Sequence, residues 1–293
     1  MRSLSLVICV AVSMECLGVA TAAFGQSAKS LKEAIDANPQ VAAIARATPK
    51  IVGGEPVDIA DRPWQVALVR GLDPEPKRSQ FCGGSVIDPG WVLTAAHCVR
   101  NTLVREDPSR VNVVVGTSQF FLGGERIPVA AIHIHPKYVD QTHDFDFALL
   151  RLTRSVTMGG GAVTKPVDLA DANAQIPDGT KAFVSGWGAV SEGGPGSLDL
   201  LGVEIPIVSN DVCNKPESYG GDVTTNMLCA GRASGGADSC QGDSGGPLTA
   251  KLQERTALIG VVSFGEGCAR RLKFGVYARV PVAASWITTT MKK

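Results

Sequence analysis

Three short segments of this chain carry the residue types that activate a serine for nucleophilic attack. In chain order they are Thr94-Ala95-Ala96-His97-Cys98, Asp144-Phe145-Asp146-Phe147-Ala148-Leu149-Leu150 and Asp238-Ser239-Cys240-Gln241-Gly242-Asp243-Ser244-Gly245-Gly246-Pro247. A serine hydroxyl is a weak nucleophile, so it needs an imidazole that takes its proton and a carboxylate that orients the imidazole. One such segment can arise by chance, but three in the order His, Asp, Ser are specific to this chemistry.

Other side chains compete for these roles. His133, His135 and His143 lie outside such motifs and are interpreted as surface or structural residues. His133 and His135 lie two positions apart, so on a strand they would share one face and could bind a metal, but the sequence offers no third ligand. Asp144 is the alternative to Asp146, because the period of a strand would direct both carboxylates the same way.

The elements that position these residues are predicted to be strands. The chain has 33 glycines among 293 residues, and short β-like runs at 64–69, 91–94, 111–115 and 257–262 are bounded by turn residues. This pattern predicts an all-β barrel or sandwich. A helix is expected only near the end, at about 282–291. Lys and Arg number 28 against 28 for Asp and Glu, which disfavours binding to nucleic acid or anionic lipid.

The amino terminus is typical of an export signal. Arg2 precedes an apolar run at 4–14 and small residues at 19–23, which predicts a signal peptide over residues 1–22. An uncleaved membrane anchor is the alternative, but Glu15 interrupts an apolar stretch shorter than the roughly 20 residues that a span needs. We therefore expect a secreted protein, extracellular or periplasmic, without a stable membrane anchor.

Export changes the interpretation of the cysteines. Of eight, Cys9 and Cys16 leave with the signal, and six remain. An even number in an exported chain predicts three disulfides, although six cysteines allow about 15 pairings. Residues 23–50 are interpreted as a propeptide, because Lys50 precedes Ile51-Val52-Gly53-Gly54, which suggests cleavage after Lys50. The remaining domain would span residues 51–293.

These motifs resemble those of the trypsin-like (chymotrypsin-fold) serine peptidases. The resemblance runs from Ile51 almost to the carboxyl terminus and includes Ile51-Val52-Gly53-Gly54, Cys82-Gly83-Gly84-Ser85, Gly186-Trp187-Gly188, Met227-Leu228-Cys229-Ala230-Gly231 and Gly275-Val276-Tyr277. It implies two six-stranded antiparallel β-barrels with the active site between them and a C-terminal helix. It further implies a secreted zymogen that hydrolyses peptide bonds through an acyl-enzyme.

The resemblance also implies catalytic roles. Ser244 would be the nucleophile, His97 the general base and then acid, and Asp146 the orienting carboxylate, since the family pattern Asp-x-Ala-Leu-Leu selects Asp146 over Asp144. The backbone N–H groups of Gly242 and Ser244 would form the oxyanion hole.

Substrate choice is implied by a further set of residues. Asp238 matches the floor of the primary specificity pocket, where a carboxylate pairs with Arg or Lys, and Gly265 and Gly275 match its walls. The segment that starts at Ser263 would pair with the bound peptide as an added strand. The alternative for Asp238 is a solvated loop carboxylate.

Activation and disulfides follow from the same resemblance. The α-amino group of Ile51, freed by the cut after Lys50, would pair with Asp243 and set the oxyanion loop. The implied disulfides are Cys82 with Cys98, Cys213 with Cys229, and Cys240 with Cys268.

Protein or peptide substrates with Arg or Lys, and protein inhibitors, are the expected partners of a monomer. No cofactor and no metal are expected, because Thr117 stands where calcium-binding trypsins carry their first acidic ligand. The alternative function is that of a catalytically inactive relative acting as a binding protein. Such proteins lose a triad residue or the activation site, whereas this chain retains both.

Overall fold

The computed structural model describes residues 52–71, 79–101, 103–120, 122–160 and 162–292. The predicted signal peptide, the predicted propeptide and both residues that flank the expected cut, Lys50 and Ile51, lie outside this part of the chain. Within the described residues, no helix has the length and apolar character needed to cross a membrane.

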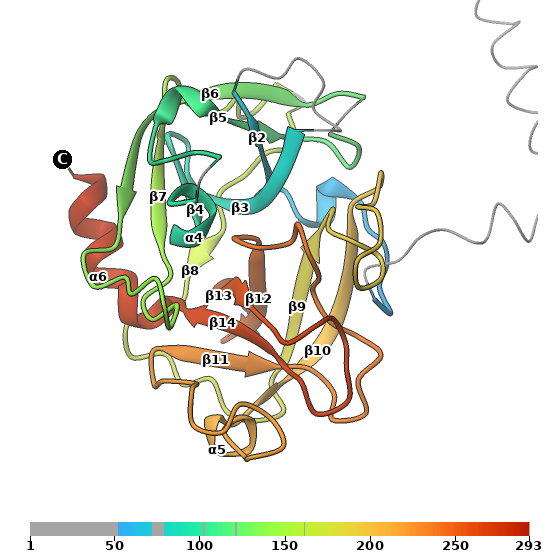
Figure 1. Ribbon diagram of the computed structural model, residues 1–293. Coiled ribbons are helices and arrows are strands. Elements are labelled where there is room, and N and C mark those ends of the chain that lie inside the picture. Colours follow the sequence, from blue (N-terminus) through green and yellow to red (C-terminus); the bar gives the residue numbers. More distant parts are fainter. Residues whose placement is uncertain (1–51, 72–78, 102, 121, 161, 293) are drawn as a thin grey trace, which may run out of the picture. The chain divides into compact units, whose positions relative to one another are not determined.

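Six strands form the first barrel, shown in the upper half of Figure 1. They are β2 (Gln65–Arg70), β3 (Gln80–Asp88), β4 (Trp91–Thr94), β5 (Val111–Val115), β6 (Glu125–Ile134) and β7 (Ala148–Leu152). The sheet closes in the order β2-β3-β4-β7-β6-β5, and all its pairs are antiparallel. Alternate residues point inward, as Val111, Val113 and Val115 of β5 show, and they build the largest core cluster.

The second barrel occupies the lower half of Figure 1. Its strands are β9 (Lys181–Gly186), β10 (Leu201–Val208), β11 (Met227–Ala230), β12 (Pro247–Leu252), β13 (Arg255–Phe264) and β14 (Gly275–Arg279). They follow the order β10-β11-β14-β13-β12-β9, and the pairing of β9 with β10 closes the ring. Two short strands lie outside it: β1 (Glu55–Pro56) on β10, and β8 (Asp168–Leu169), parallel to β13. The expectation of two six-stranded antiparallel barrels is confirmed.

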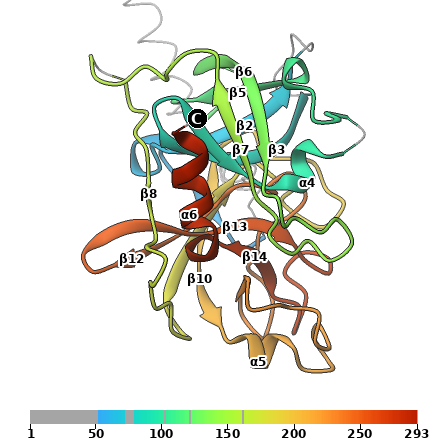
Figure 2. The same cartoon turned by 90° about the vertical axis from the view of Figure 1, so that its left-hand side faces the viewer.

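The long helix of the described chain is α6 (Val280–Met291). Its buried residues Val280, Ala283 and Ile287 belong to the same cluster as Leu149 of β7, although α6 follows directly from β14 of the other barrel. Figure 2 shows α6 at the level where the two barrels meet. The expected C-terminal helix is therefore confirmed. It continues from the second barrel and packs against the core of the first.

Four shorter helical turns complete the set: η1 (Ile59–Asp61), α4 (Ala96–Val99), η2 (Pro108–Arg110) and α5 (Asn210–Cys213). Three disulfides join Cys82 to Cys98, Cys213 to Cys229, and Cys240 to Cys268, the same pairs that the resemblance implies. The first of them connects β3 to α4, the turn that carries His97, and thus limits how far α4 can move from the barrel.

Candidate active site

Asp146 and His97 are joined by two hydrogen bonds. His97 lies on α4, directly after β4, and Asp146 lies just before β7, which pairs with β4. Asp146 Oδ1 accepts from the His97 backbone N–H at 2.9 Å, and Oδ2 lies 2.7 Å from His97 Nδ1. The Ser263 hydroxyl donates to the same Oδ2 at 2.5 Å. These contacts fix the orientation of the imidazole.

The charge state of Asp146 follows from its surroundings. Its side chain is fully buried. Burial raises the pKa of a carboxyl group, but the adjacent His97 and the hydrogen bonds from His97 and Ser263 outweigh this and hold the pKa of Asp146 below its usual value. An ionised Asp146 accepts a hydrogen bond from His97 Nδ1–H, and the lone pair of this tautomer then lies on Nε2.

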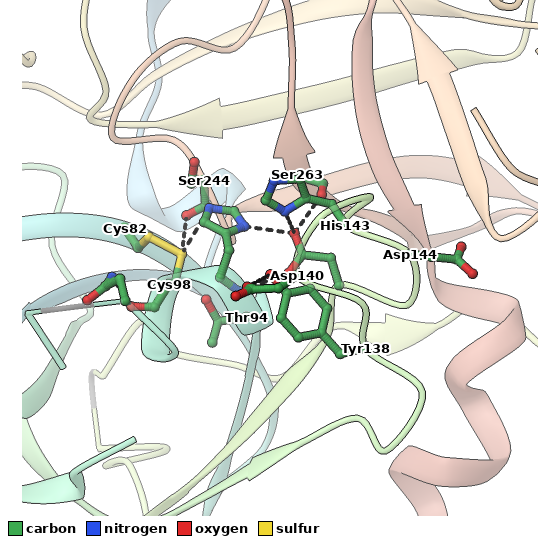
Figure 3. Close-up of polar contacts among 12 residues, drawn as sticks. Cys82, Thr94, Cys98, Tyr138, Asp140, His143, Asp144, Ser244 and Ser263 are labelled. Carbon is green, nitrogen blue, oxygen red and sulfur yellow. Dashed lines mark hydrogen bonds and ion pairs between the residues drawn. A yellow bond between two sulfur atoms is a disulfide. The ribbon is translucent and has the colours of Figure 1, made fainter. Parts of the chain in front are cut away.

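Ser244 is held in place by the first barrel, although it belongs to the second. Gly83 N donates to the Ser244 carbonyl at 2.7 Å. At the next position, a Cβ on Gly245 would lie 2.2 Å from Thr94 Oγ1, so a larger residue cannot occupy this turn. Figure 3 shows Ser244 beside the Cys82–Cys98 disulfide. Among the described residues no hydrogen bond joins the Ser244 hydroxyl to His97, and contacts of this kind often tighten only when substrate binds.

The backbone around Gly242 presents two unused donors. The Gln241 carbonyl accepts from Ala189 N at 2.7 Å, so the N–H of Gly242, on the other side of the same peptide plane, points the opposite way. Gly242 has φ +96°, a conformation that favours glycine. Within the described chain neither Gly242 N–H nor Ser244 N–H donates to a protein acceptor. The two groups can therefore bind an anion.

Asp243 is a buried carboxylate held by backbone donors. Oδ1 accepts from Gly188 N at 2.8 Å and Oδ2 from Cys240 N at 2.9 Å. A Cβ on Gly186 or Gly188 would lie 2.2 or 2.5 Å from Asp243, so both positions must remain glycine. Burial raises the pKa of Asp243 to about 6, which marks it as a carboxylate that gains from a cationic partner.

Val52, the first residue that the structure describes, lies next to the segment from Asp238 to Asp243. Val52 packs against a small cluster that contains Cys240, and its carbonyl accepts from Asp238 N at 3.2 Å. The chain that follows Ile51 is therefore attached to the segment between Asp238 and Asp243.

A pocket of about 200 Å³ opens beside Ser244. It is lined by residues that include Asp238, Ser239, Ser244, Ser263, Gly265 and Gly275. A Cβ on Gly275 would lie 2.6 Å from Asp238 Oδ1, whereas one on Gly265 would meet only ordinary contacts, the nearest at 3.6 Å. The structure thus brings the predicted nucleophile and all four predicted pocket residues together.

Asp238 is buried, which contradicts the alternative of a solvated loop carboxylate. Its Oδ1 accepts from Ser239 N at 2.8 Å. Burial raises the pKa of Asp238 to about 7 despite this hydrogen bond and one from Ala269 N. A cation that entered the pocket would offset the cost of burying the charge.

The assumption that Asp144 and Asp146 lie on one strand is wrong. The segment is a turn in which His143 and Phe145 adopt φ of 54° and 51°. The Asp144 side chain therefore does not point the same way as that of Asp146. Its carboxylate accepts hydrogen bonds from Thr224 Oγ1 at 2.6 Å and from Asn226 Nδ2 at 3.1 Å. Figure 3 shows it directed away from Ser263. It links the segment that carries Asp146 to the second barrel.

Removal of this link should lower stability. We expect Asp144→Ala to lower the free energy of unfolding by about 1–3 kcal/mol, because hydrogen bonds to a charged group are lost and two donors lose their acceptor. Urea unfolding checks this, with Asp144→Asn as the matched variant that keeps an acceptor for Thr224. Equal losses for the two variants would contradict the proposed link.

The remaining histidines are placed by aromatic contacts. His135 stacks on Phe145 and packs edge-on against Trp286, both at 4.7 Å between ring centroids, which assigns it a structural role. His133 packs beside Trp91. The sequence predicts that His143 is a surface or structural residue, but its ring lies 5.5 Å from that of His97.

His143 is the residue at the site that sequence reasoning missed. Its Nδ1 lies 3.9 Å from Asp146 Oδ2, and its only sequence signal was a position three residues before Asp146. In the described chain, donor atoms of His97, His143 and Asp146 lie within 4.8 Å of one another, close enough to share an ion. The Asp146 oxygens, however, already accept hydrogen bonds from His97 and Ser263.

Comparison with known proteins agrees with this geometry. The model of the family named Trypsin matches residues 51–287. Trypsin 5G1 of Aedes aegypti is 41% identical over 242 residues, which cover 83% of this chain and 85% of that protein. Hypodermin-B of Hypoderma lineatum is 42% identical over 245 residues, which cover 83% of this chain and 88% of that protein. The chain belongs to the trypsin family and is a serine endopeptidase.

Proposed function

We propose that this protein hydrolyses peptide bonds after Arg or Lys, with Ser244, His97 and Asp146 as its catalytic triad. The observation that carries the substrate class is the buried carboxylate of Asp238 in the pocket beside Ser244. The pocket has room for a long side chain, and the carboxylate provides the charge that a guanidinium or ammonium group would neutralise.

The reaction follows from the contacts at the site. His97 Nε2 accepts the proton of Ser244 as the hydroxyl oxygen attacks the substrate carbonyl carbon. The N–H groups of Gly242 and Ser244 stabilise the oxyanion, and Asp146 stabilises the imidazolium through the 2.7 Å contact with Nδ1. His97 then gives the proton to the leaving amine, and an ester remains on Ser244. Water, deprotonated by His97, hydrolyses this ester and restores the enzyme.

The test of this proposal is a series of matched peptide substrates. The purified chain, cut after Lys50, is assayed for kcat/KM on peptides that differ only in a residue before the scissile bond, which is Arg, Lys, Phe or Ala. Hydrolysis after Arg and Lys alone supports the proposal. Cleavage after Phe or Ala would contradict the role of Asp238. Absence of turnover would contradict the triad and favour a binding protein with this fold.

The charge of Asp238 leads to a pH prediction. Because the pKa of Asp238 is about 7 in the empty pocket, a cation binds an ionised site above pH 7 and must displace a proton below it. We expect the Kd of benzamidine, a small aromatic cation, to be constant above pH 7 and to rise up to about tenfold per pH unit below it. Calorimetry should show proton release at pH 6 and little at pH 8.5.

The control for this prediction is Asp238→Asn, which keeps the shape of the pocket but removes its charge. This variant should lose the pH dependence and most of the affinity for benzamidine. It should lower kcat/KM on an Arg peptide by about 10²–10⁴-fold, the equivalent of the roughly 3–5 kcal/mol lost when one partner of a buried pair is removed. A pH dependence retained in Asp238→Asn would assign the titration to another group.

The activation scheme is also part of the proposal. The protein is exported, and cleavage after Lys50 frees the α-amino group of Ile51, which pairs with Asp243. Two observations support this: Asp243 is a buried carboxylate with a raised pKa, and Val52 lies against the segment between Asp238 and Asp243.

A further inference from the structure

An ion pair joins two loops beside the pocket. Glu192 lies in the loop between β9 and β10, and Arg270 lies in the loop between β13 and β14. Arg270 Nε donates to Glu192 Oε2 at 2.8 Å, and Arg270 Nη2 donates to Oε1 at 2.5 Å. Two parallel hydrogen bonds between planar groups fix the orientation as well as the distance of the partners.

The ion pair rests directly on the wall of the pocket. Gly267 and Cys268 both line the pocket. A Cβ on Gly267 would lie 2.3 Å from Arg270 Nε and 2.7 Å from Glu192 Oε2. The Cys268 N–H also faces the Glu192 carboxylate. The two charged groups therefore lie against the backbone of two residues that line the pocket.

The loop that carries Arg270 adopts conformations that its residues do not favour. Ala269 and Leu272 have φ of 53° and 59°, a region that side chains other than glycine rarely adopt. Such conformations persist only where the surrounding contacts hold them. Ala269 N also faces Asp238 Oδ2 at 3.4 Å, so a shift of this loop would change the surroundings of the pocket floor.

The loop that carries Glu192 is anchored to Gln241, another residue that lines the pocket. Ala189 N donates to the Gln241 carbonyl, and Gly193 N donates to Gln241 Oε1 at 3.3 Å. Gln241 directly precedes Gly242. Glu192 is thus connected through its own loop to the candidate oxyanion hole and through Arg270 to the loop that carries Gly267 and Cys268.

From this arrangement we infer that Glu192 and Arg270 are positioning residues that hold the Gly267–Cys268 wall in the form that binds an Arg or Lys side chain. The inference rests on the proposed function. Neither residue touches the reacting atoms, so the pair acts on substrate binding rather than on the chemical step. Its side chains are 41% and 53% exposed, so dissolved salt weakens the pair.

The test uses the activated enzyme with three changes: Glu192→Gln, Arg270→Gln, and the exchange of the two charges in Glu192→Arg with Arg270→Glu. Each single variant should raise KM for an Arg peptide and Ki for benzamidine by about 2–5-fold, with kcat changed by less than about twofold. The exchanged pair should return both constants to within about twofold of the wild type. In 1 M NaCl the difference between the single variants and the wild type should shrink.

The matched control is Glu204→Gln, which removes an exposed ion pair between Glu204 on β10 and Lys181 on β9. Neither residue lines the pocket, so this variant should leave KM and Ki unchanged. Unchanged constants in both single variants of the pocket pair would overturn the inference, and so would an equal loss in the exchanged pair. If the wild type itself neither binds benzamidine nor cleaves after Arg, the proposed function has failed instead.

Discussion

Replacement of Ser244 by alanine should lower kcat on an Arg peptide by about 10⁶-fold, with little change in the Kd of benzamidine. If Ser244 is the nucleophile, as we propose, the variant cannot form an acyl-enzyme, and His97 and Asp146 have no hydroxyl to activate. The pocket around Asp238 remains, because the backbone of Ser244 keeps its hydrogen bond from Gly83. Steady-state kinetics on the cut enzyme measures kcat, and calorimetry measures the Kd of benzamidine for the wild type and the variant.

The matched control for this experiment is Ser155→Ala, at an exposed position that does not line the pocket. It should retain wild-type kcat and KM. A Ser244→Ala variant that still released a burst of product would assign the nucleophile to another residue.

Cleavage after Lys50 should raise kcat/KM by about 10²–10⁴-fold. In the uncut chain Asp243 has no α-ammonium partner, and an unpaired buried charge costs about 3–5 kcal/mol, so the neighbouring Gly242 would not be held in a form that binds the oxyanion. The comparison uses Lys50→Gln, which removes the cationic side chain before the bond, and Lys50→Arg, which keeps one.

Treatment with an activating peptidase should produce an Ile51 amino terminus and full activity in the wild type and in Lys50→Arg, but not in Lys50→Gln. Amino-terminal sequencing and kcat/KM are measured on the same samples. Full activity of the uncut Lys50→Gln chain would contradict the pairing of Ile51 with Asp243.

Several strands could be predicted because short runs of apolar residues between turn residues are typical of strands. The runs at 91–94 and 111–115 coincide with β4 and β5, since aromatic and β-branched residues bounded by turn signals fit the pleated, buried surface of a sheet. The run at 257–262 lies inside the longer β13, because pairing with β12 and β14 extends a strand beyond its most apolar part.

Other features depended on contacts that no local pattern reports. The two-residue period of a strand could not show that the Asp144 and Asp146 side chains point in different directions. The turn in which His143 and Phe145 have left-handed backbone conformations is stabilised by hydrogen bonds from Thr224 and Asn226 to Asp144, some eighty residues away in the sequence. The same turn places the His143 ring beside that of His97.

The family, the order of the candidate catalytic residues and the cysteines available for pairing were predictable from the amino-acid sequence, because they depend on residue identity along the chain. The three-dimensional arrangement was needed to show that Asp238 and Asp243 are buried and that Glu192 contacts Arg270. It was also needed to show that the N–H groups of Gly242 and Ser244 donate to no protein acceptor in the described chain. Burial and pairing are properties of the surroundings in space, and residues as far apart as Glu192 and Arg270 meet only when the second barrel has closed.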